Sequence, residues 1–282
     1  MADIAATTVM KLREMTNAGM MDCKKALVEC NGDLNAAMDL LRKRGIATAA
    51  KKASREANQG VIAAAVLPGA RVGVLAEVNC ETDFVAKNDL FRAFADQVAR
   101  AVAENPAADL EALRTDAVSR IRENIRIART RRLEVQGNGL IAAYIHTGAK
   151  VGVLVEVGAT QQATVANEVF RQFVKDTTLQ IAAANPLAVR KEDIDPALIE
   201  KEKEIVANSD AVKNKPAQAV AKIIEGKLEK YFKDNCLLHQ GFVKRNGEIT
   251  VQEHLAAVAK QVGDEITIRR FLRFQVGEAF TG

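Results

Sequence analysis

The chain is poor in the residues that usually carry out catalysis or staple a secreted fold. It has no tryptophan, two tyrosines, three histidines, five prolines and four cysteines in 282 residues. Because the cysteines form no CxxC pair and nothing marks the chain as secreted, we expect buried, reduced thiols. The longest apolar run, at 61–67, has seven residues, whereas a membrane span needs about 20. No basic segment followed by an apolar one opens the sequence, so we expect no signal peptide and a cytoplasmic protein.

The motifs of covalent chemistry and of nucleotide binding are missing as well. His146, His239 and His254 lie in no HExxH pattern, and Cys236 with His239 forms only half of a zinc-site signature. There is no GxxxxGK[ST] loop, and the acidic residues fall mostly on predicted helical faces, where they are solvated by default. We therefore expect a protein without enzymatic activity, cofactor or metal.

Positive charge is concentrated at the N-terminal end. The whole chain has 40 basic and 36 acidic residues, a net charge of +4. Residues 1–55 hold ten of the basic and six of the acidic residues, so the excess belongs to this segment. Apolar residues recur there at helical spacing, in stretches that end at Gly19, at 31–33 and at Gly45, which predicts three short helices. An exposed connector is expected from about Lys51 to Gly60.

One side of the second predicted helix does not face the core of this bundle. Met21 lies off the apolar stripe and beside Lys24, a combination typical of a docking surface for a partner. A scattered surface methionine among solvated lysines is the alternative.

The rest of the chain contains a duplicated unit. Residues 60–78 align with 139–157 at an offset of 79, with twelve of nineteen positions identical. Each copy predicts a β-hairpin with a Gly-Ala turn, followed by a helix that ends near an Asn-Pro pair. A third strand follows in each copy, from Ile125 and from Ile266, at an offset of 141.

The change of offset by 62 indicates an insertion in the second copy, at about 187–248. Apolar periodicity inside it predicts helices at about 197–207 and 217–231, which would form a projecting antiparallel hairpin. The expected fold is therefore α+β. It has a helical domain at 1–55, a first core repeat at 56–138, and a second repeat at 139–282 that carries the hairpin.

An arginine-rich segment at 120–132 leaves a second function open. Seven arginines in residues 114–132 would contact phosphates and give salt-dependent RNA binding. However, the interleaved aromatic residues of an RNA-binding sheet are missing, and Ile125 and Ile127 alternate as in a strand. We expect the arginines to line a sheet edge or to pair with acids, with RNA binding as the alternative.

The two copies differ where the hairpin leads into the helix. Asp83 and Phe84 of the first copy stand opposite Gln162 and Ala163 of the second. Because the second copy lacks an aromatic residue there, the fold does not require one. Although a phenylalanine is more often buried, this difference predicts that Phe84 is an exposed anchor for a partner.

Three segments resemble signature sequences of the elongation factor Ts family: 16–27 (TNAGMMDCKKAL), 81–87 (ETDFVAK) and 237–243 (LLHQGFV). The resemblance covers essentially the whole chain. It implies a UBA-like three-helix domain, a two-subdomain core with a helical hairpin, and a bacterial cytoplasmic protein. Members of this family are guanine nucleotide exchange factors for the translational GTPase elongation factor Tu, in complexes with one or two copies of each partner.

The resemblance also implies roles for individual residues. The segment expected to disturb the magnesium site of the GTPase consists of Thr82, Asp83, Phe84 and Val85. Phe84 would wedge between helices of the nucleotide-binding domain, and Asp83 would support that contact. The residues that match docking positions are Arg13, Met20, Met21, Lys24, Ile125 and His146. The stretch 125–129 (IRIAR) departs from the usual strand of the family, which bears on the neighbours of Ile125.

Overall fold

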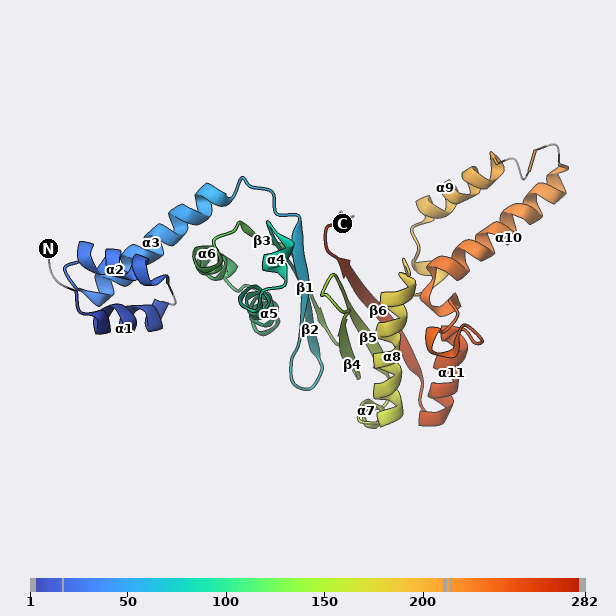
Figure 1. Cartoon of the computed structure of the whole chain (residues 1–282). Coiled ribbons are helices and arrows are strands. Elements are labelled where there is room, and N and C mark those ends of the chain that lie inside the picture. The colour runs from blue at the N-terminus through green and yellow to red at the C-terminus, as the bar shows by residue number, and fades with distance from the viewer. Residues whose placement is uncertain (1–3, 17, 210–211, 214, 279–282) are drawn as a thin grey trace.

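The computed structural model describes residues 4–16, 18–209, 212–213 and 215–278. Helices are combined with two small sheets whose strands are all antiparallel, in agreement with the predicted α+β class. The molecule is elongated (Figure 1). A helical bundle lies at one end, two small sheets lie in the middle, and two long helices project at the other end.

Three helices form the bundle: α1 (Ala6–Thr16), α2 (Met20–Glu29) and α3 (Leu34–Lys52). Its core contains Leu12, Cys23 and Leu27, all fully buried, as the helical spacing predicted. Met15 and Met20 also fall at helical spacing from these core residues, but they are 50% and 42% exposed. They lie in the last turn of α1 and at the first residue of α2, where the neighbouring helix no longer covers them.

The third helix is longer than the sequence predicted, because Gly45 does not end it. Glycine in a helix interior costs about 1 kcal/mol relative to alanine. Here Gly45 is buried against α6 (Leu110–Ile121), and a Cβ at this position would lie 3.6 Å from Thr115 Cγ2. Close packing of the two helices therefore offsets the poor propensity, and part of the expected connector is helical.

The two halves of the core have the same topology. In each, a hairpin pairs with a third strand, which gives sheet orders β1-β2-β3 and β4-β5-β6, all antiparallel. One helix packs on the sheet of each half and ends at the predicted Asn-Pro pair. The elements of the first half are β1 (Gln59–Val66), β2 (Val72–Cys80), α4 (Asp83–Ala86), α5 (Asp89–Glu104), α6 and β3 (Ile125–Glu134). Those of the second are β4 (Gly139–Ile145), β5 (Val151–Ala159), α7 (Gln162–Val165), α8 (Glu168–Ala184), α11 (Val251–Val262) and β6 (Ile266–Gln275).

Sequence reasoning missed a pair of equivalent helices, α6 and α11. They start at Leu110 and Val251, which differ by the same offset of 141 that relates the third strands. Asp109 caps α6, and Thr250 with Glu253 forms a capping box at the start of α11. The capping box was a readable signal for the second helix.

The two sheets meet through pairs of equivalent residues. Ile62 N–H donates to Ala149 O and Ile141 N–H donates to Ala70 O, each at 2.7 Å. Ile62 and Ile141 are both 1% exposed and belong to the apolar cluster between the halves. Gly73 leaves room for this contact, since a Cβ there would lie only 2.6 Å from Ile141 Cγ2. The halves are thus related like the subunits of an isologous dimer.

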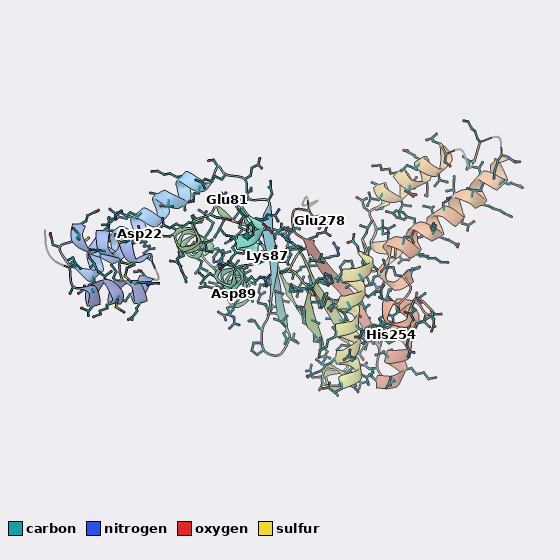
Figure 2. All side chains as sticks on the ribbon, in the orientation of Figure 1. Asp22, Glu81, Lys87, Asp89, His254 and Glu278 are labelled. Atoms are coloured by element: carbon teal, nitrogen blue, oxygen red, sulfur yellow. The ribbon has the colours of Figure 1, made fainter. Side chains whose placement is uncertain are left out.

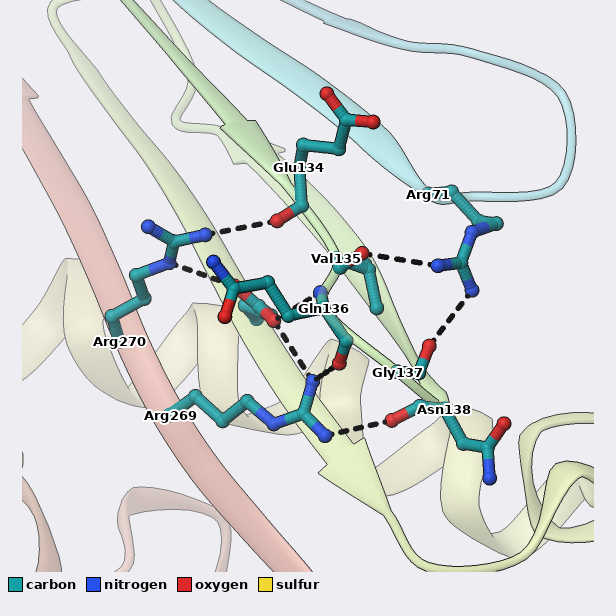
Figure 3. Close-up of polar contacts among 9 residues, drawn as sticks. Arg71, Glu134, Val135, Gln136, Gly137, Asn138, Arg269 and Arg270 are labelled. Atoms are coloured by element: carbon teal, nitrogen blue, oxygen red, sulfur yellow. Dashed lines mark hydrogen bonds and ion pairs between the residues drawn. The ribbon is translucent and has the colours of Figure 1, made fainter.

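Arginines surround the chain segment that joins the two halves (Figure 3). Arg71 donates to the carbonyl oxygens of Val135 and Gly137, each at 3.0 Å. Arg269 donates to Asn138 O at 2.9 Å and also to Gln136 O. Because these carbonyls accept side-chain hydrogen bonds, the linking segment is fixed without being part of a strand.

A buried glutamate lies at the same position in each half. Glu77 is 3% exposed and pairs with Arg129 Nε at 2.8 Å. Glu156, at the offset of 79, is 1% exposed and pairs with Arg270 Nε at 2.7 Å and with Arg269 Nη1 at 3.0 Å. Glu77 with Arg129 and Glu156 with Arg270 are equivalent cross-strand pairs, so each sheet carries the same ion pair around a buried carboxylate.

The helices that project from the second half are α9 (Pro196–Ala207) and α10 (Ala217–Asn235), which pack on each other. Their inner face includes Val206, which is 5% exposed. The apolar residues Leu198 and Ile205 of the same helix are 44% and 55% exposed. Two packed helices bury only a narrow stripe on each. Ile199 and Val206, seven residues apart, lie on that stripe. Leu198 and Ile205 each stand one residue before them and therefore point away from the partner helix. Three short 3-10 helices complete the description: Lys191–Asp193, Leu237–His239 and Val243–Arg245.

Candidate functional site

Among the large apolar side chains of the described residues, Phe84 is the most exposed, at 81%. It lies in α4, a single helical turn that follows β2 at one edge of the first half. An aromatic ring left in water at such a position loses the free energy that burial would bring, about 2 kcal/mol. The exposure expected from the comparison of the two copies is therefore present in the structure.

The residues beside Phe84 fix the turn. Thr82 is the N-cap of α4, and its Oγ1 accepts from Val85 N–H at 3.3 Å. Ala86 is 3% exposed, and Val85 packs against the core cluster of the first half. Because the turn is held by Thr82, Val85 and Ala86, the phenyl ring of Phe84 points into solvent, where it is free to contact a partner.

Asp83 forms a local ion pair with Lys87, with Oδ2 2.7 Å from Nζ. This hydrogen bond lowers the pKa of Asp83, so the carboxylate is charged at neutral pH. Figure 2 shows Glu81 and Lys87 in the first half of the core, between the helical bundle and the sheets. The turn therefore presents an aromatic ring beside a carboxylate that a lysine already partly neutralises.

Sequence reasoning missed a second acid at the turn, Glu123. Its Oε2 accepts from the backbone N–H groups of Glu81 and Thr82 at 3.0 and 3.1 Å, and its Oε1 accepts from Thr82 Oγ1 at 2.6 Å. Asp264 stands at the equivalent place of the second half, at an offset of 141. An acid at both positions of the repeat was the signal that could have revealed it.

The corresponding turn of the second half has the same support without the aromatic residue. Asp264 accepts from Gln161 N–H at 2.9 Å, from Thr164 Oγ1 at 2.6 Å and from Thr160 Oγ1. Desolvation would raise the pKa of Asp264, but these hydrogen bonds outweigh it and lower the pKa to about 2. The two turns are thus equivalent as structures, and they differ in what they present to solvent.

The residues expected to dock the bundle are exposed, but they form a second patch. On α2, Met21 is 61% exposed and Lys24 is exposed, and Arg13 is exposed on α1. The bundle is attached to the core by an ion pair between Asp22 and Arg122 and by Lys52 Nζ, which donates to Arg122 O at 2.7 Å. Asp22 lies where the bundle meets the core (Figure 2). Since α6 and α5 separate α2 from α4 (Figure 1), the two patches are distinct contact areas.

The two docking residues expected on the core have different environments. Ile125 is completely buried in the core cluster of the first half, so its side chain is not accessible to a partner in this structure. As the first residue of β3 it faces the helices that cover the sheet. His146 is exposed in the turn after β4, where Nδ1 lies 2.9 Å from Tyr144 Oη. Of this pair, only His146 is available for contact.

The arginine-rich segment has a structural role. Arg129 pairs with buried Glu77, Arg132 pairs with Glu134 at 2.6 Å, and Arg120 pairs with Asp116 at 3.3 Å. Arg120 and Arg122 also precede the strand, because β3 begins only at Ile125. These ion pairs agree with the prediction that the arginines pair with neighbouring acids.

In the part of the chain that the structure describes, no three His, Cys, Asp or Glu side chains are grouped so that they could ligate a metal. None of the described helices combines the length and apolar character that crossing a membrane requires. All four cysteines are free thiols; Cys23, Cys80 and Cys236 are buried, whereas Cys30, which was also expected to be buried, is partly exposed.

An α+β fold that presents an aromatic residue on a fixed turn is typical of a protein that acts by binding a partner. Comparison with known proteins makes this class specific. Residues 81–278 match the family model described as elongation factor TS. The chain is 42% identical to elongation factor Ts of Nitratidesulfovibrio vulgaris (strain DP4) over 277 residues, with 98% of this chain and 96% of the relative covered. It is 43% identical to that of Symbiobacterium thermophilum over 285 residues (99% and 93%), and 40% identical to that of Bdellovibrio bacteriovorus over 288 (97% and 92%). The chain belongs to the elongation factor Ts family, and so to the translation elongation factors.

Proposed function

We propose that the chain is a guanine nucleotide exchange factor for elongation factor Tu. It binds the GDP form, disturbs the magnesium and phosphate site, promotes GDP release and stays bound to the nucleotide-free GTPase until GTP binds. Family membership supports this proposal. The observation that carries it for this chain is Phe84, an exposed ring on a fixed turn that the duplicate half does not share.

The proposed mechanism needs no covalent chemistry in this chain. A GTPase holds GDP through its phosphate loop and a magnesium ion that bridges the phosphates and the protein. Insertion of Phe84 beside this site would shift the loop and remove contacts from the diphosphate. Each loss of about 1.4 kcal/mol weakens nucleotide binding tenfold.

The same coupling also explains release. If this chain weakens the binding of GDP, then GDP weakens the binding of this chain by the same factor, because coupling free energies are reciprocal. Nucleotide rebinding therefore displaces the exchange factor. It accelerates exchange in both directions and does not itself choose GTP over GDP.

The two exposed patches suit separate tasks. Arg13, Met20, Met21 and Lys24 would dock the bundle, with His146 as a further contact from the second half. Asp83 and Phe84 would act at the nucleotide site, with Thr82 and Val85 fixing their turn. The docking residues would then supply affinity for elongation factor Tu, and the α4 turn would weaken the binding of GDP to that GTPase.

The test is the release of fluorescent GDP from elongation factor Tu. Wild-type protein should accelerate release, and Phe84→Ala should lose most of this effect, because truncating an aromatic anchor costs about 2 kcal/mol or more of binding. Leu187→Ala is the matched control, since Leu187 is an apolar residue 56% exposed in the second half. Equal release rates for wild type and a folded Phe84→Ala variant would contradict the proposed role of Phe84.

A further inference from the structure

Glu123 is placed to control the turn that carries Phe84. It lies in the short link between α6 and β3, 41 residues along the chain from Thr82. Its carboxylate accepts three hydrogen bonds from the two residues just before α4, with donor–acceptor distances of 2.6 to 3.1 Å. Hydrogen bonds to a charged acceptor are roughly twice as strong as those between neutral groups.

The turn depends on such outside support because it is short. Helix α4 has four residues, whereas isolated helices below about 12 residues are marginal in water. The link that carries Glu123 makes a further contact with the same segment, since Asn124 N–H donates to Glu81 Oε1 at 2.5 Å. The approach to α4 is therefore fixed from one side by two consecutive residues of the α6–β3 link.

The second half of the molecule has the same kind of carboxylate support but no aromatic residue on its turn, so it distinguishes the role of the carboxylate from that of Phe84. Asp264 accepts from Thr160 and Gln161, the equivalents of the Glu81 and Thr82 that Glu123 contacts in the first half, and also from Thr164 within the turn. The residue equivalent to Phe84 in that turn is Ala163. A carboxylate at this place is therefore a property of the fold, while its consequence for a partner depends on Phe84.

We propose that Glu123 is a positioning residue for nucleotide exchange: it holds the α4 turn in one conformation, so that Phe84 is ordered before the partner binds. This inference rests on the proposed function and deepens it. A contact that is ordered in advance does not lose free energy to ordering on binding. Removal of the Glu123 carboxylate therefore weakens the action of Phe84 while leaving the phenyl ring itself in place.

Two measurements on the full chain test the role, with Glu123→Gln and Asp264→Asn as matched variants. In the free protein, hydrogen exchange of peptides covering 81–90 should be about tenfold faster in Glu123→Gln, which corresponds to 1.4 kcal/mol. In Asp264→Asn the faster exchange should appear instead at 160–169. This measurement needs no partner, so it remains informative if the chain fails to act on elongation factor Tu.

The second measurement is fluorescent-GDP release from elongation factor Tu at saturating exchange factor. Glu123→Gln should slow release about tenfold, Asp264→Asn should equal wild type, and Glu123→Asp should recover part of the rate. Combining Glu123→Gln with Phe84→Ala should be no slower than Phe84→Ala alone, because both changes act through one side chain.

The outcomes separate the two proposals. If wild type does not accelerate release, the proposed function fails, and the exchange data on 81–90 still decide whether Glu123 fixes the turn. The positioning role is overturned if a folded Glu123→Gln variant keeps wild-type exchange at 81–90. Equal slowing by Asp264→Asn, or multiplicative effects in the double variant, would also overturn it.

Discussion

Phe84 is exposed because its neighbours in the turn, and not Phe84 itself, pack against the core of the first half. Val85 and Ala86 face the core and Thr82 caps the turn, so a residue between them in a single helical turn must point outward. This is a property that a single sequence rarely reveals. Here the duplicate half supplied the comparison, since Ala163 at the equivalent place showed that the fold needs no aromatic residue.

The environment of the cysteines leads to a prediction at the same scale. Burial raises the pKa of the Cys80 thiol to about 12, helped by the negative charge of Glu123, and burial raises that of Cys236 to about 11. The thiolate is the reactive form, and Cys30 is the one cysteine that is not fully buried. Iodoacetamide at pH 8 should therefore label Cys30 first, as measured by peptide mass spectrometry.

Replacing Cys30 with serine should remove the fast phase of labelling and leave the slow phase unchanged. Labelling of Cys80 in the folded protein at the rate of Cys30 would show that the edge of the first sheet opens far more readily than its burial indicates.

At the scale of elements, α3 shows how packing overrides a local signal. Glycine is a common helix end, and no pattern near Gly45 indicated that another helix would lie against it. The contact with Thr115 and Ser119 of α6 joins parts of the chain about 70 residues apart, which periodicity within one segment does not report. The strands and the helices after each hairpin could be predicted because the repeat doubled their pattern.

Gly45 gives a prediction in two directions. A Cβ at Gly45 would have ordinary contact distances of 3.6 to 3.7 Å, so Gly45→Ala should fit and stabilise the protein by about 1 kcal/mol through helix propensity. Gly45→Leu should instead force α3 away from α6 and destabilise the protein by about 1–3 kcal/mol. Urea unfolding measures both changes.

Gly226→Ala in α10 is the control for the propensity term, because a Cβ there meets nothing within 4 Å. A Gly45→Leu variant as stable as wild type would show that the bundle does not depend on this contact with the core.

At the scale of the whole molecule, two buried glutamates tie the halves together. Glu156 accepts from Arg269 and Arg270 of β6 and also from Gln136 N–H in the link between the halves, at 3.3 Å. The sequence showed Glu77 and Glu156 as identical positions of the repeat, yet not that they were buried, because each pairs with an arginine opposite it on the third strand of its own sheet, 52 and 114 residues further along the chain. Predicting these pairs required the register between the second and third strands, which no single-segment pattern contains.

Glu156 predicts a pH dependence of stability. Burial would raise the pKa of Glu156, but the hydrogen bonds from Arg270 and Arg269 outweigh it, so the pKa is lowered from 4.5. A lowered pKa means that the carboxylate stabilises the fold above pH 4.5 and that this contribution is lost as the pH falls below that value. Glu156→Gln should therefore be less stable than wild type by about 2 kcal/mol at pH 7, and the difference should shrink in acid.

Urea unfolding at a series of pH values measures this difference. Glu134→Gln is the control, because the Glu134 side chain is 63% exposed and such surface pairs contribute about 0–1 kcal/mol. A gap between wild type and Glu156→Gln that stays constant from pH 7 to below pH 4 would contradict the assignment.

The two carboxylate-supported turns have a consequence for how this molecule can change over time. Both halves keep the same backbone at the edge of the sheet, yet a phenyl ring is present at only one of them. Under the proposed function only the first turn meets the partner, so the asymmetry of the molecule lies in a few surface side chains and not in the path of the backbone. On that proposal, substitutions at the second turn are constrained by folding alone, whereas those at the first turn are constrained by the partner as well.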